Sequence, residues 1–274
     1  MRLAYQGEPG AYSEAAARLF SPHTETLPCK TFDEVFDAVV EKRATHGVVP
    51  MENSVGGTIH RNYDLLVDHE IAITGEVELD VVHCLQALPG TKIADVKIVY
   101  SHPQALAQCE RYLKELGVTV EAVYDTAGGA KLVAEQRLTG AAALASRRAA
   151  EVFGLEVIQE AVQDFEFNIT RFFIIGGAPP ADANKTTIVF ALPSMPGSLF
   201  KALSVFALRD INLSKLESRP IRGRPWEYLF YVDIDTRRDE LPCARALTQL
   251  GEFAKWVRVL GTYKGWERAR QTQI

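Results

Sequence analysis

Residues 171–191 read RFFIIGGAPPADANKTTIVFA, and this stretch divides the chain into two parts. Residues 171–175 are almost continuously apolar, which is typical of a strand that is covered on both faces of its sheet. The following residues are rich in Gly and Pro, as in a linker, and a new β-branched run begins at Thr186. We therefore expect a first region at 1–178, a linker at 179–185, a second domain at 186–264 and a tail at 265–274.

The region before the linker alternates between short apolar runs and segments with a helical period. A capping box at Thr31 and Glu34 predicts the start of one helix, and residues 103–116 read as a single helix that follows a strand at 97–100. Alternation of this kind predicts an α/β fold.

The region after the linker has a different order of elements. We expect strand, helix, strand, strand, helix and strand at residues 186–191, 198–208, 211–217, 227–234, 241–253 and 257–263. This βαββαβ order is that of a ferredoxin-like domain.

The composition argues against several classes of protein. The net charge is −5, and no stretch combines Lys and Arg with aromatic residues as a nucleic-acid surface requires. The four cysteines contain no C-x-x-C pair, so we expect no metal site. No apolar run reaches the ~18 residues that span a bilayer, and a strand begins directly after Met1. We expect a cytoplasmic protein without a nucleic-acid or membrane partner.

The turns that follow the predicted strands share one kind of chemistry. Ser54, Ser101, Thr126 and Ser146 each place a hydroxyl group where a helix is expected to begin. Ligands of open α/β sheets bind beyond the carboxyl ends of the strands, where helix N-termini offer unpaired N–H groups. Each residue alone is explained as a helix N-cap. Together they indicate a site for a small organic anion.

Single residues in these turns keep two interpretations each. His102 is either a general acid or a capping histidine, Glu52 is either a catalytic carboxylate or a turn residue, and Gln108 is either a site residue or part of a solvated helix face. The chain contains no nucleotide-phosphate motif, nucleophile elbow or H-E-x-x-H sequence. Residue chemistry alone therefore leaves the reaction open.

Four motifs in the first region resemble those of prephenate dehydratases: GVVPMENS at 47–54, NYDLL at 62–66, SHPQ at 101–104 and NITRFF at 168–173. The second region resembles an ACT regulatory domain through PGSLF at 196–200, INL at 211–213 and ESRP at 217–220. The resemblance implies two α/β lobes arranged as in a type 2 periplasmic binding protein, with prephenate in the cleft between them. It also implies conversion of prephenate to phenylpyruvate without a cofactor.

The resemblance assigns roles to individual residues. Thr170 is implied to be essential and to bond the hydroxyl that leaves, whereas without the resemblance it reads as a β-branched residue at the start of a strand. Arg171 either pairs with a substrate carboxylate or balances Asp164 or Glu166. The other implied catalytic residues are Asn53, Ser101 and Gln108, and the implied substrate-binding residues are Glu52, Ser54, His102, Thr126, Arg171 and Phe172.

For the ACT domain, the resemblance implies that L-phenylalanine binds between protomers of a homodimer or homotetramer and lowers activity. The implied effector-binding residues are Gly197, Ser198, Leu199, Asn212, Leu213, Glu217, Ser218 and Arg219. Taken alone, residues 217–220 read as a strand end that enters a turn at Pro220. Ser198 stands where many relatives carry Ala, which leaves the affinity for the effector open.

Other interpretations of the chain remain. The opening YQGEPGAYSE at 5–14 is shared with plant arogenate dehydratases, whose substrate differs from prephenate by one amino group. A non-catalytic amino-acid sensor built from the same two parts is the alternative outside the enzymes. Because no chorismate mutase segment precedes Met1, we expect a monofunctional enzyme.

Overall fold

The computed structural model describes residues 1–221 and 223–267 and contains two compact units. The first comprises Met1–Leu65 and Val77–Ile174, and the second comprises Leu66–Glu76 and Ile175–Ile274. Residues 66–76, which we placed in the first region, therefore cluster with the C-terminal part of the chain.

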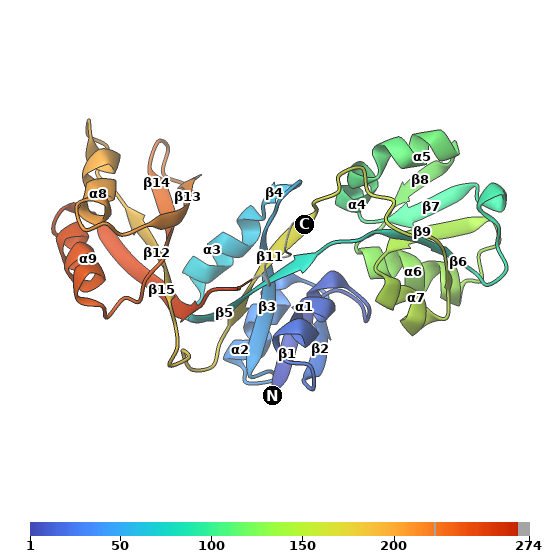
Figure 1. Ribbon diagram of the computed structural model, residues 1–274, viewed down its shortest axis with the longest axis horizontal. Coiled ribbons are helices and arrows are strands. Elements are labelled where there is room, and N and C mark those ends of the chain that lie inside the picture. Colours follow the sequence, from blue (N-terminus) through green and yellow to red (C-terminus); the bar gives the residue numbers. More distant parts are fainter. Residues whose placement is uncertain (222, 268–274) are drawn as a thin grey trace, which may run out of the picture. The chain divides into compact units, whose positions relative to one another are not determined.

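The first unit contains two α/β lobes, and the chain begins in the lobe drawn in blue in Figure 1. In its sheet β1 (Arg2–Gln6) lies between β2 (Glu25–Cys29) and β3 (His46–Asn53) and is parallel to both. Next to β3 comes β11 (Ile169–Ile175), followed by β5 (Ile73–Asp80), and β4 (Gly57–Thr58) pairs with the end of β3. The helices of this lobe are α1 (Tyr12–Phe20), α2 (Phe32–Val40) and α3 (His60–Asp68).

The predicted capping box begins α2. The Thr31 hydroxyl accepts from the Glu34 amide at 3.2 Å, and Oε2 of Glu34 accepts from the Lys30 amide at 2.8 Å. The predicted helix start at Thr31 is confirmed, but only half of the capping box is formed, because Glu34 accepts from the Lys30 amide and not from the Thr31 amide.

The second lobe holds a separate sheet with the strand order β10-β6-β9-β7-β8. Its strands are β6 (Cys84–Ala87), β7 (Ile98–Ser101), β8 (Thr119–Ala122), β9 (Ala141–Ala145) and β10 (Glu156–Gln159). Its helices are α4 (Pro103–Gln108), α5 (Glu110–Leu116), α6 (Thr126–Glu135) and α7 (Arg147–Phe153), with a short 3-10 turn η1 (Ile93–Asp95). Buried apolar side chains from β6, β7, β9 and α5 form its core.

The predicted single helix at 103–116 is wrong in one respect. Cys109, at φ −120° and ψ 20°, separates α4 from α5, so the first of them ends at Gln108. Its backbone conformation lies outside the α-helical region.

The chain crosses between the lobes twice. It leaves the first lobe along β5 and returns through residues 160–168 to β11, which lies between β3 and β5. A strand that follows the second lobe therefore completes the sheet of the first. The two α/β lobes that the resemblance implied are therefore confirmed.

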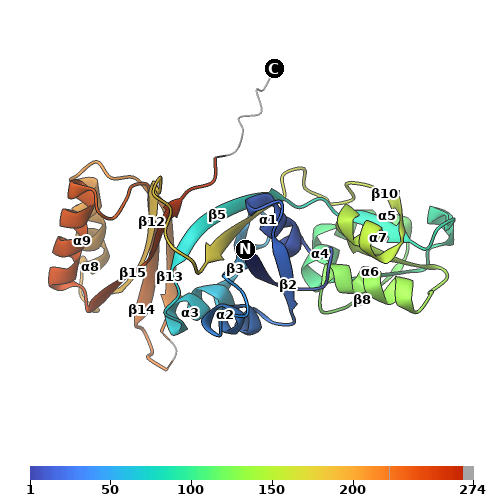
Figure 2. The ribbon, with the colours of Figure 1, turned by 90° about the horizontal axis from the view of Figure 1, so that it is seen from below.

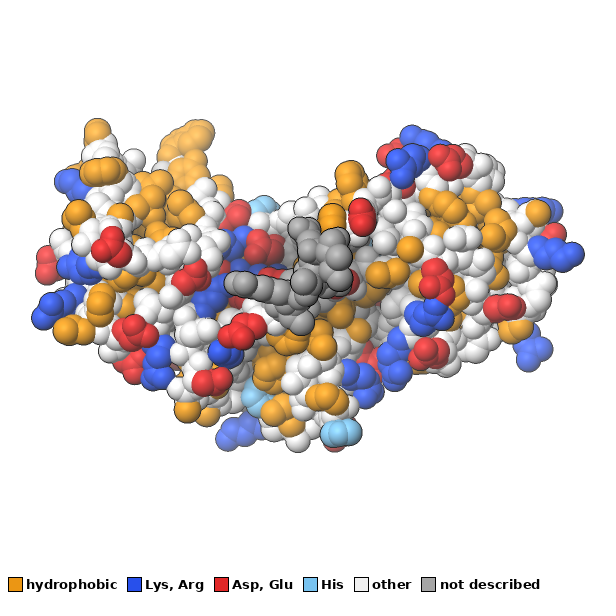
Figure 3. Space-filling view, viewed as in Figure 1, with side chains coloured by type: hydrophobic (Ala, Val, Ile, Leu, Met, Phe, Trp, Pro, Cys, Tyr) orange, Lys and Arg blue, Asp and Glu red, His pale blue; other side chains and the backbone are white. Residues whose placement is uncertain are grey.

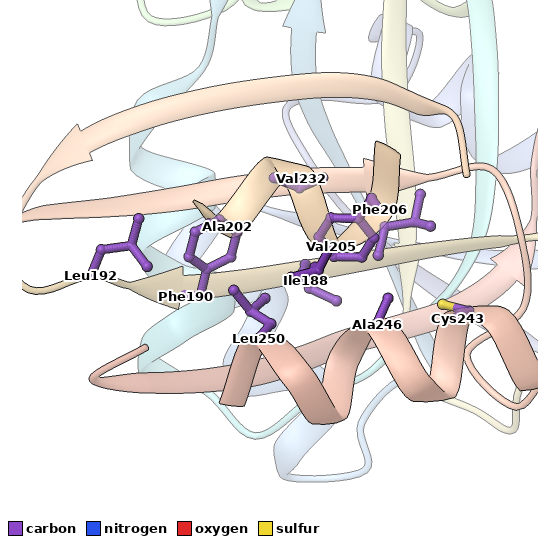
Figure 4. Close-up of a cluster of buried hydrophobic side chains, with 11 residues drawn as sticks. Ile188, Phe190, Leu192, Ala202, Val205, Phe206, Val232, Cys243, Ala246 and Leu250 are labelled. Atoms are coloured by element: carbon purple, nitrogen blue, oxygen red, sulfur yellow. The ribbon is translucent and has the colours of Figure 1, made fainter. Parts of the chain in front are cut away.

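The second unit contains the predicted βαββαβ domain. Its elements are β12 (Lys185–Ala191), α8 (Ser198–Ala207), β13 (Leu213–Pro220), β14 (Tyr228–Ile234), α9 (Leu241–Phe253) and β15 (Trp256–Lys264). The strand order is β13-β14-β12-β15 with antiparallel neighbours, and both helices lie on one face of the sheet (Figure 2). Between sheet and helices lies a dry core that includes Ile188, Phe190, Phe206, Val232 and Leu250 (Figure 4).

Residues 66–76 join the second unit through its edge strand β15. Gly261 lies opposite Ile73 in a parallel pair, and a Cβ at this glycine would meet the Ile73 carbonyl oxygen at 2.1 Å. The Arg258 guanidinium donates to the carbonyl oxygens of Val67 and His69 at 2.8 and 2.7 Å. These bonds satisfy carbonyl groups near the end of α3.

Lys and Arg side chains are interspersed with Asp and Glu on the face that Figure 3 shows. Within residues 1–221 and 223–267, no helix is both long and apolar enough to cross a membrane.

Candidate active site

A pocket of about 500 Å³ lies within the first unit, and residues of both lobes line it. The residues at or beside the first turns of α1, α2, α4 and α6 all contribute to its wall. Phe32, Ile59, Val81 and Phe172 supply apolar surface, and Lys30 supplies a positive charge. Helix N-termini carry unpaired N–H groups and partial positive charge, so the pocket suits an organic anion with an apolar ring.

Three amide side chains form a closed ring of hydrogen bonds beside this pocket. Nδ2 of Asn53 donates to Oδ1 of Asn168 at 2.6 Å, Nδ2 of Asn168 donates to Oε1 of Gln108 at 2.9 Å, and Nε2 of Gln108 donates to Oδ1 of Asn53 at 3.1 Å. Oδ1 of Asn53 also accepts from the amides of Val55 and Gly56 at 3.0 and 2.6 Å. Two fixed N–H donors therefore set the orientation of all three amides.

Thr170 is 8% exposed and lines the pocket from β11. Its Oγ1 accepts from Nδ2 of Asn53 at 3.0 Å. The described residues offer no acceptor for its hydroxyl hydrogen, so this hydrogen is available to a ligand. Phe172, two residues further along the strand, faces the same pocket, because alternate side chains share one side of a strand.

His83 and Tyr12 form a second polar group in the wall. His83 is 2% exposed, its Nε2 lies 2.8 Å from Oε1 of Gln108, and its Nδ1 lies 3.0 Å from the Tyr12 hydroxyl. The same hydroxyl lies 2.7 Å from the Val82 carbonyl oxygen. Burial lowers the pKa of His83 and raises that of Tyr12 well above its ordinary value.

His102 and Thr126 also line the pocket. Nδ1 of His102 accepts from the Gln104 amide at 3.2 Å and so caps α4. Burial lowers the pKa of His102, and the Asp125 charge opposes part of that shift. An unprotonated Nδ1 is what the cap requires.

Asp125 joins the two lobes at the rim of the pocket. Its Oδ2 accepts from the Glu8 amide at 2.7 Å, and its Oδ1 accepts from the Ala127 amide at 2.7 Å. Around it, the Glu8 carboxylate accepts from the Tyr124 hydroxyl at 2.5 Å and from Nζ of Lys131 at 3.2 Å. Burial raises the pKa of Asp125, and the backbone hydrogen bonds oppose that shift.

A second contact between the lobes involves Gly10. The Ser146 hydroxyl donates to the Gly10 carbonyl oxygen at 2.6 Å and caps α7 by accepting from the Ala149 amide at 3.1 Å. Gly10 has a φ of +90°, and a Cβ there would lie 2.6 Å from Cα of Ala149. Only glycine allows the lobes to approach this closely.

The predicted site residues fall into two groups. Asn53, Gln108, His102, Thr126, Thr170 and Phe172 all line the pocket. Glu52, Ser54, Ser101 and Arg171 are not among its lining residues. Their contact with a substrate stays a prediction.

The residues of the second group have other neighbours. Nη1 of Arg171 pairs with Oε1 of Glu52 at 3.2 Å, and the guanidinium lies 4.7 Å from the centre of the Phe173 ring. Glu52 is thus a partner of Arg171 that the sequence did not suggest. The Ser101 hydroxyl donates to the Leu144 carbonyl oxygen at 2.6 Å, and Ser54 accepts from the Ile169 amide at 2.9 Å.

Tyr12, His83, Asp125 and Asn168 were not predicted as site residues. Asn168 lies in the NITRFF motif and Asp125 follows the strand β8, so both stood beside predicted positions. Tyr12 and His83 are 71 positions apart and follow no strand that the sequence predicted. Tyr12 lies in the shared opening at 5–14, but no sequence signal joined it to His83.

A family model for prephenate dehydratase matches residues 3–180, and an ACT domain model matches residues 186–252. The chain belongs to the prephenate dehydratase family. It is accordingly a dehydratase that carries an ACT domain after its two-lobed region.

Similar proteins carry several names. Arogenate dehydratase/prephenate dehydratase 2, chloroplastic, of Arabidopsis thaliana is 49% identical over 276 residues, which cover 96% of this chain and 72% of the relative. The structure of prephenate dehydratase in complex with L-Phe from Arthrobacter aurescens is 30% identical with a TM-score of 0.86, covering 96% of this chain and 90% of that one. The structure of GqqA, described as a novel type of quorum quenching acylase, is 36% identical with a TM-score of 0.89, covering 97% and 98%.

The predicted effector residues of this family member lie at two places in the ACT domain. Gly197, at φ +79°, is the N-cap of α8, and Ser198 and Leu199 line a pocket of about 340 Å³ together with Trp226 and Tyr228. The other predicted effector residues do not line that pocket.

This other group lies on or next to β13, at the edge of the sheet. Glu217 and Ser218 pair with Tyr231 and Phe230 of β14, and Leu213 and Arg219 lie on the same strand. Asn212 donates to Oδ2 of Asp235 at 2.5 Å.

Proposed function

We propose that the protein converts prephenate to phenylpyruvate, carbon dioxide and water. In this reaction the bond to the ring carboxylate breaks, its electron pair enters the ring, and the ring hydroxyl leaves with one added proton. The gain of aromaticity drives the reaction, and no oxidant or reductant is needed. The observation that carries the proposal is the free hydroxyl hydrogen of Thr170, which is held at the wall of an anion-suited pocket.

The residues of the pocket supply what this reaction requires. Thr170 donates to the leaving hydroxyl, and the Asn53 amide holds its oxygen in place. The N-termini of α1 and α2 and the Lys30 ammonium attract the pyruvyl carboxylate, since Ala11 to Ser13 and Lys30 to Asp33 line the pocket. Phe32 and Phe172 offer the departing carboxylate a poorly solvated surface, which favours its loss as carbon dioxide.

Arogenate is the second candidate substrate, and one observation favours it. Arogenate carries an ammonium group where prephenate has a ketone, and two carboxylates, Asp33 and Asp125, line the pocket. The relative in Arabidopsis thaliana is named for both activities. A carboxylate near the ammonium group would favour arogenate electrostatically.

An acylase activity, as described for GqqA, finds less support in the pocket. Acyl transfer of the serine type needs a hydroxyl nucleophile in hydrogen-bond contact with a base. Oγ1 of Thr170 contacts the Asn53 amide, which is no base, and the His83 imidazole contacts a phenol and an amide.

The ACT domain supports regulation by L-phenylalanine. Its strand β13 carries Glu217, Ser218 and Arg219. Among the strands of residues 1–221 and 223–267 it pairs with β14 alone, which offers its other edge to a second copy. We therefore propose a homodimer or homotetramer that binds phenylalanine between protomers. Light scattering measures the mass of this oligomer. We also propose a cytoplasmic location, although relatives in Arabidopsis thaliana are named chloroplastic.

The experiment that tests the function supplies prephenate and arogenate separately and quantifies phenylpyruvate and phenylalanine, with and without added phenylalanine. Formation of phenylpyruvate from prephenate supports the proposal. If only arogenate gives a product, arogenate is the substrate. Asp125→Asn and Asp33→Asn are compared by the ratio of kcat/KM for the two substrates. A selective loss with arogenate identifies the carboxylate that faces the ammonium group. Acylase activity without product from either acid would contradict both substrates.

A further inference from the structure

The hydrogen-bond ring beside Thr170 determines where the protons of His83 lie. The amides of Val55 and Gly56 make Oδ1 of Asn53 an acceptor, so Nδ2 of Asn53 is a donor. Nδ2 of Asn53 donates to Oδ1 of Asn168, so Nδ2 of Asn168 is a donor. Oε1 of Gln108 accepts from that Nδ2 and is therefore an acceptor as well. An atom that only accepts must receive a hydrogen from its other neighbour, Nε2 of His83 at 2.8 Å.

Nδ1 of His83 is therefore the nitrogen that gains or loses a proton, and it faces the Tyr12 hydroxyl at 3.0 Å. In neutral His83, Nδ1 accepts from the phenol. In protonated His83, Nδ1–H donates to the phenol oxygen, and the phenol donates to the Val82 carbonyl oxygen at 2.7 Å. In both protonation states the imidazole and the phenol keep a hydrogen-bond partner, and in the neutral state Nδ1 and the Val82 carbonyl oxygen compete for the single phenol hydrogen.

Among the described residues, the groups that face the pair carry no competing charge. These groups are the Gln108 amide on α4, the amide of Gln163, whose oxygen accepts from the His83 backbone, and the thiols of Cys84 and Cys109. Burial raises the pKa of Cys109 to about 12 and also raises that of Cys84, so both thiols stay neutral. Within the pair, the imidazole is the group that changes protonation at the lower pH, because burial lowers the pKa of His83 and raises that of Tyr12.

The proposed reaction consumes one proton, and Thr170 by itself has none to spare. A hydroxyl that gave up its proton would become an alkoxide, and the Asn53 amide cannot replace that proton. Tyr12 and His83 line the same pocket as Thr170. A pair of groups that can hold a proton is therefore present in the wall of the pocket that Thr170 lines.

We propose that Tyr12 and His83 supply the proton that turns the leaving hydroxyl into water. The Tyr12 O–H bond breaks as its proton passes to the leaving oxygen, and the phenol oxygen takes the Nδ1 proton of His83. Tyr12 is again neutral, His83 has become neutral, and solvent returns its proton after the products leave. Thr170 orients the leaving oxygen by a hydrogen bond. This inference rests on the proposed dehydration.

The test compares Tyr12→Phe, His83→Gln and the double variant with the wild type, using prephenate and arogenate. Glutamine can still donate to Gln108 and accept from Tyr12, so it keeps the contacts and loses the proton. We expect kcat to fall about 10²–10⁴-fold in each single variant, with KM and the unfolding temperature little changed. The double variant should lose no more than either single one, because the two residues act as one unit.

The pH profile separates proton supply from a purely structural role. In the wild type, kcat should fall as the pH rises and His83 loses its proton, and this fall should be absent in His83→Gln. Tyr112→Phe removes a phenol that packs on the core of the second lobe, and it should leave kcat unchanged.

Wild-type turnover in His83→Gln with an unaltered pH profile would overturn the pair. Losses of kcat that multiply in the double variant would overturn it too, as would losses that parallel a fall in unfolding temperature. A wild type that forms no product from either acid removes the proposed function and the pair with it. If the wild type is active, a negative result in the variants rejects the proton supply by Tyr12 and His83 and leaves the proposed dehydration intact.

Discussion

Nε2 of Gln108 donates a 3.1 Å hydrogen bond to Oδ1 of Asn53, and this bond joins the second lobe to the first. Both side chains also bond Asn168, which lies on the segment that returns between the lobes. Nδ2 of Asn53 then holds the oxygen of Thr170. The same ring of amides thus fixes the approach of the lobes and the orientation of the hydroxyl that faces the pocket.

Asn168→Ala should damage stability and activity together. The substitution removes two buried hydrogen bonds, each worth about 0.5–1.5 kcal/mol in the free energy of unfolding, while Nδ2 of Asn53 and Oε1 of Gln108 keep their other partners. Urea unfolding measures the loss, and kcat should fall because Thr170 is held less firmly. Asn184→Ala is the control, since this exposed amide lies outside the ring. Equal losses in the two variants would contradict the importance of the ring.

Thr170→Val should remove activity and keep the fold. Valine has the shape of threonine without the hydroxyl, and loss of one donor aimed at the reacting oxygen costs about 10²–10³-fold in kcat. Thr170→Ser should retain part of the activity, since its hydroxyl can still accept from Asn53. Steady-state kinetics with circular dichroism checks both. A fully active and folded Thr170→Val protein would remove Thr170 from the mechanism.

Gly10→Ala should oppose closure of the two lobes. The added Cβ would meet Cα of Ala149 at 2.6 Å, and φ is +90° at this position. Gly90→Ala is a matched control, because Gly90 also has a positive φ but has open space around its Cα, so that it bears only the backbone strain of about 1–2 kcal/mol. We expect a raised KM in Gly10→Ala alone. A KM equal to that of Gly90→Ala would argue against a closed catalytic state.

Stability should fall as the pH drops from about 7.5 to about 5.5. Burial lowers the pKa of His83 and of His102 below the ordinary value of 6.5, so the unfolded chain binds more protons than the folded one. The contribution of the two neutral histidines to the free energy of unfolding is complete above the pKa of the unfolded chain. It decreases as the pH falls toward the lower pKa of the folded protein. His83→Gln should flatten the curve of unfolding temperature against pH. The exposed His23 provides the control substitution, and a slope that is the same in both variants would contradict this account.

Much of the fold could be predicted from residue patterns. The helix start at Thr31 and the order of elements after Thr186 came from local signals, and the structure confirms them. The strands β6 and β10 could not be predicted from local signals, because each has four residues and they pair with each other across about 70 positions of sequence. Local propensity carries no information on such a pair.

The site could be predicted only where family motifs covered it. Asn53, Gln108 and Thr170 stand in or near such motifs, and they meet through the amide ring. Tyr12 and His83 come from distant segments, and the hydrogen bond between them exists only after the chain has crossed between the lobes. The alternation along β11, which places Thr170 at the pocket and pairs Arg171 with Glu52, required the register of the sheet.

The most direct test of the central claim uses prephenate with labelled carbon in its ring carboxylate. Purified protein is incubated with this substrate, and labelled carbon dioxide and phenylpyruvate are quantified together. The account predicts that both appear in equal amounts, at a rate that Thr170→Val lowers. Release of neither product above the uncatalysed rate would contradict it.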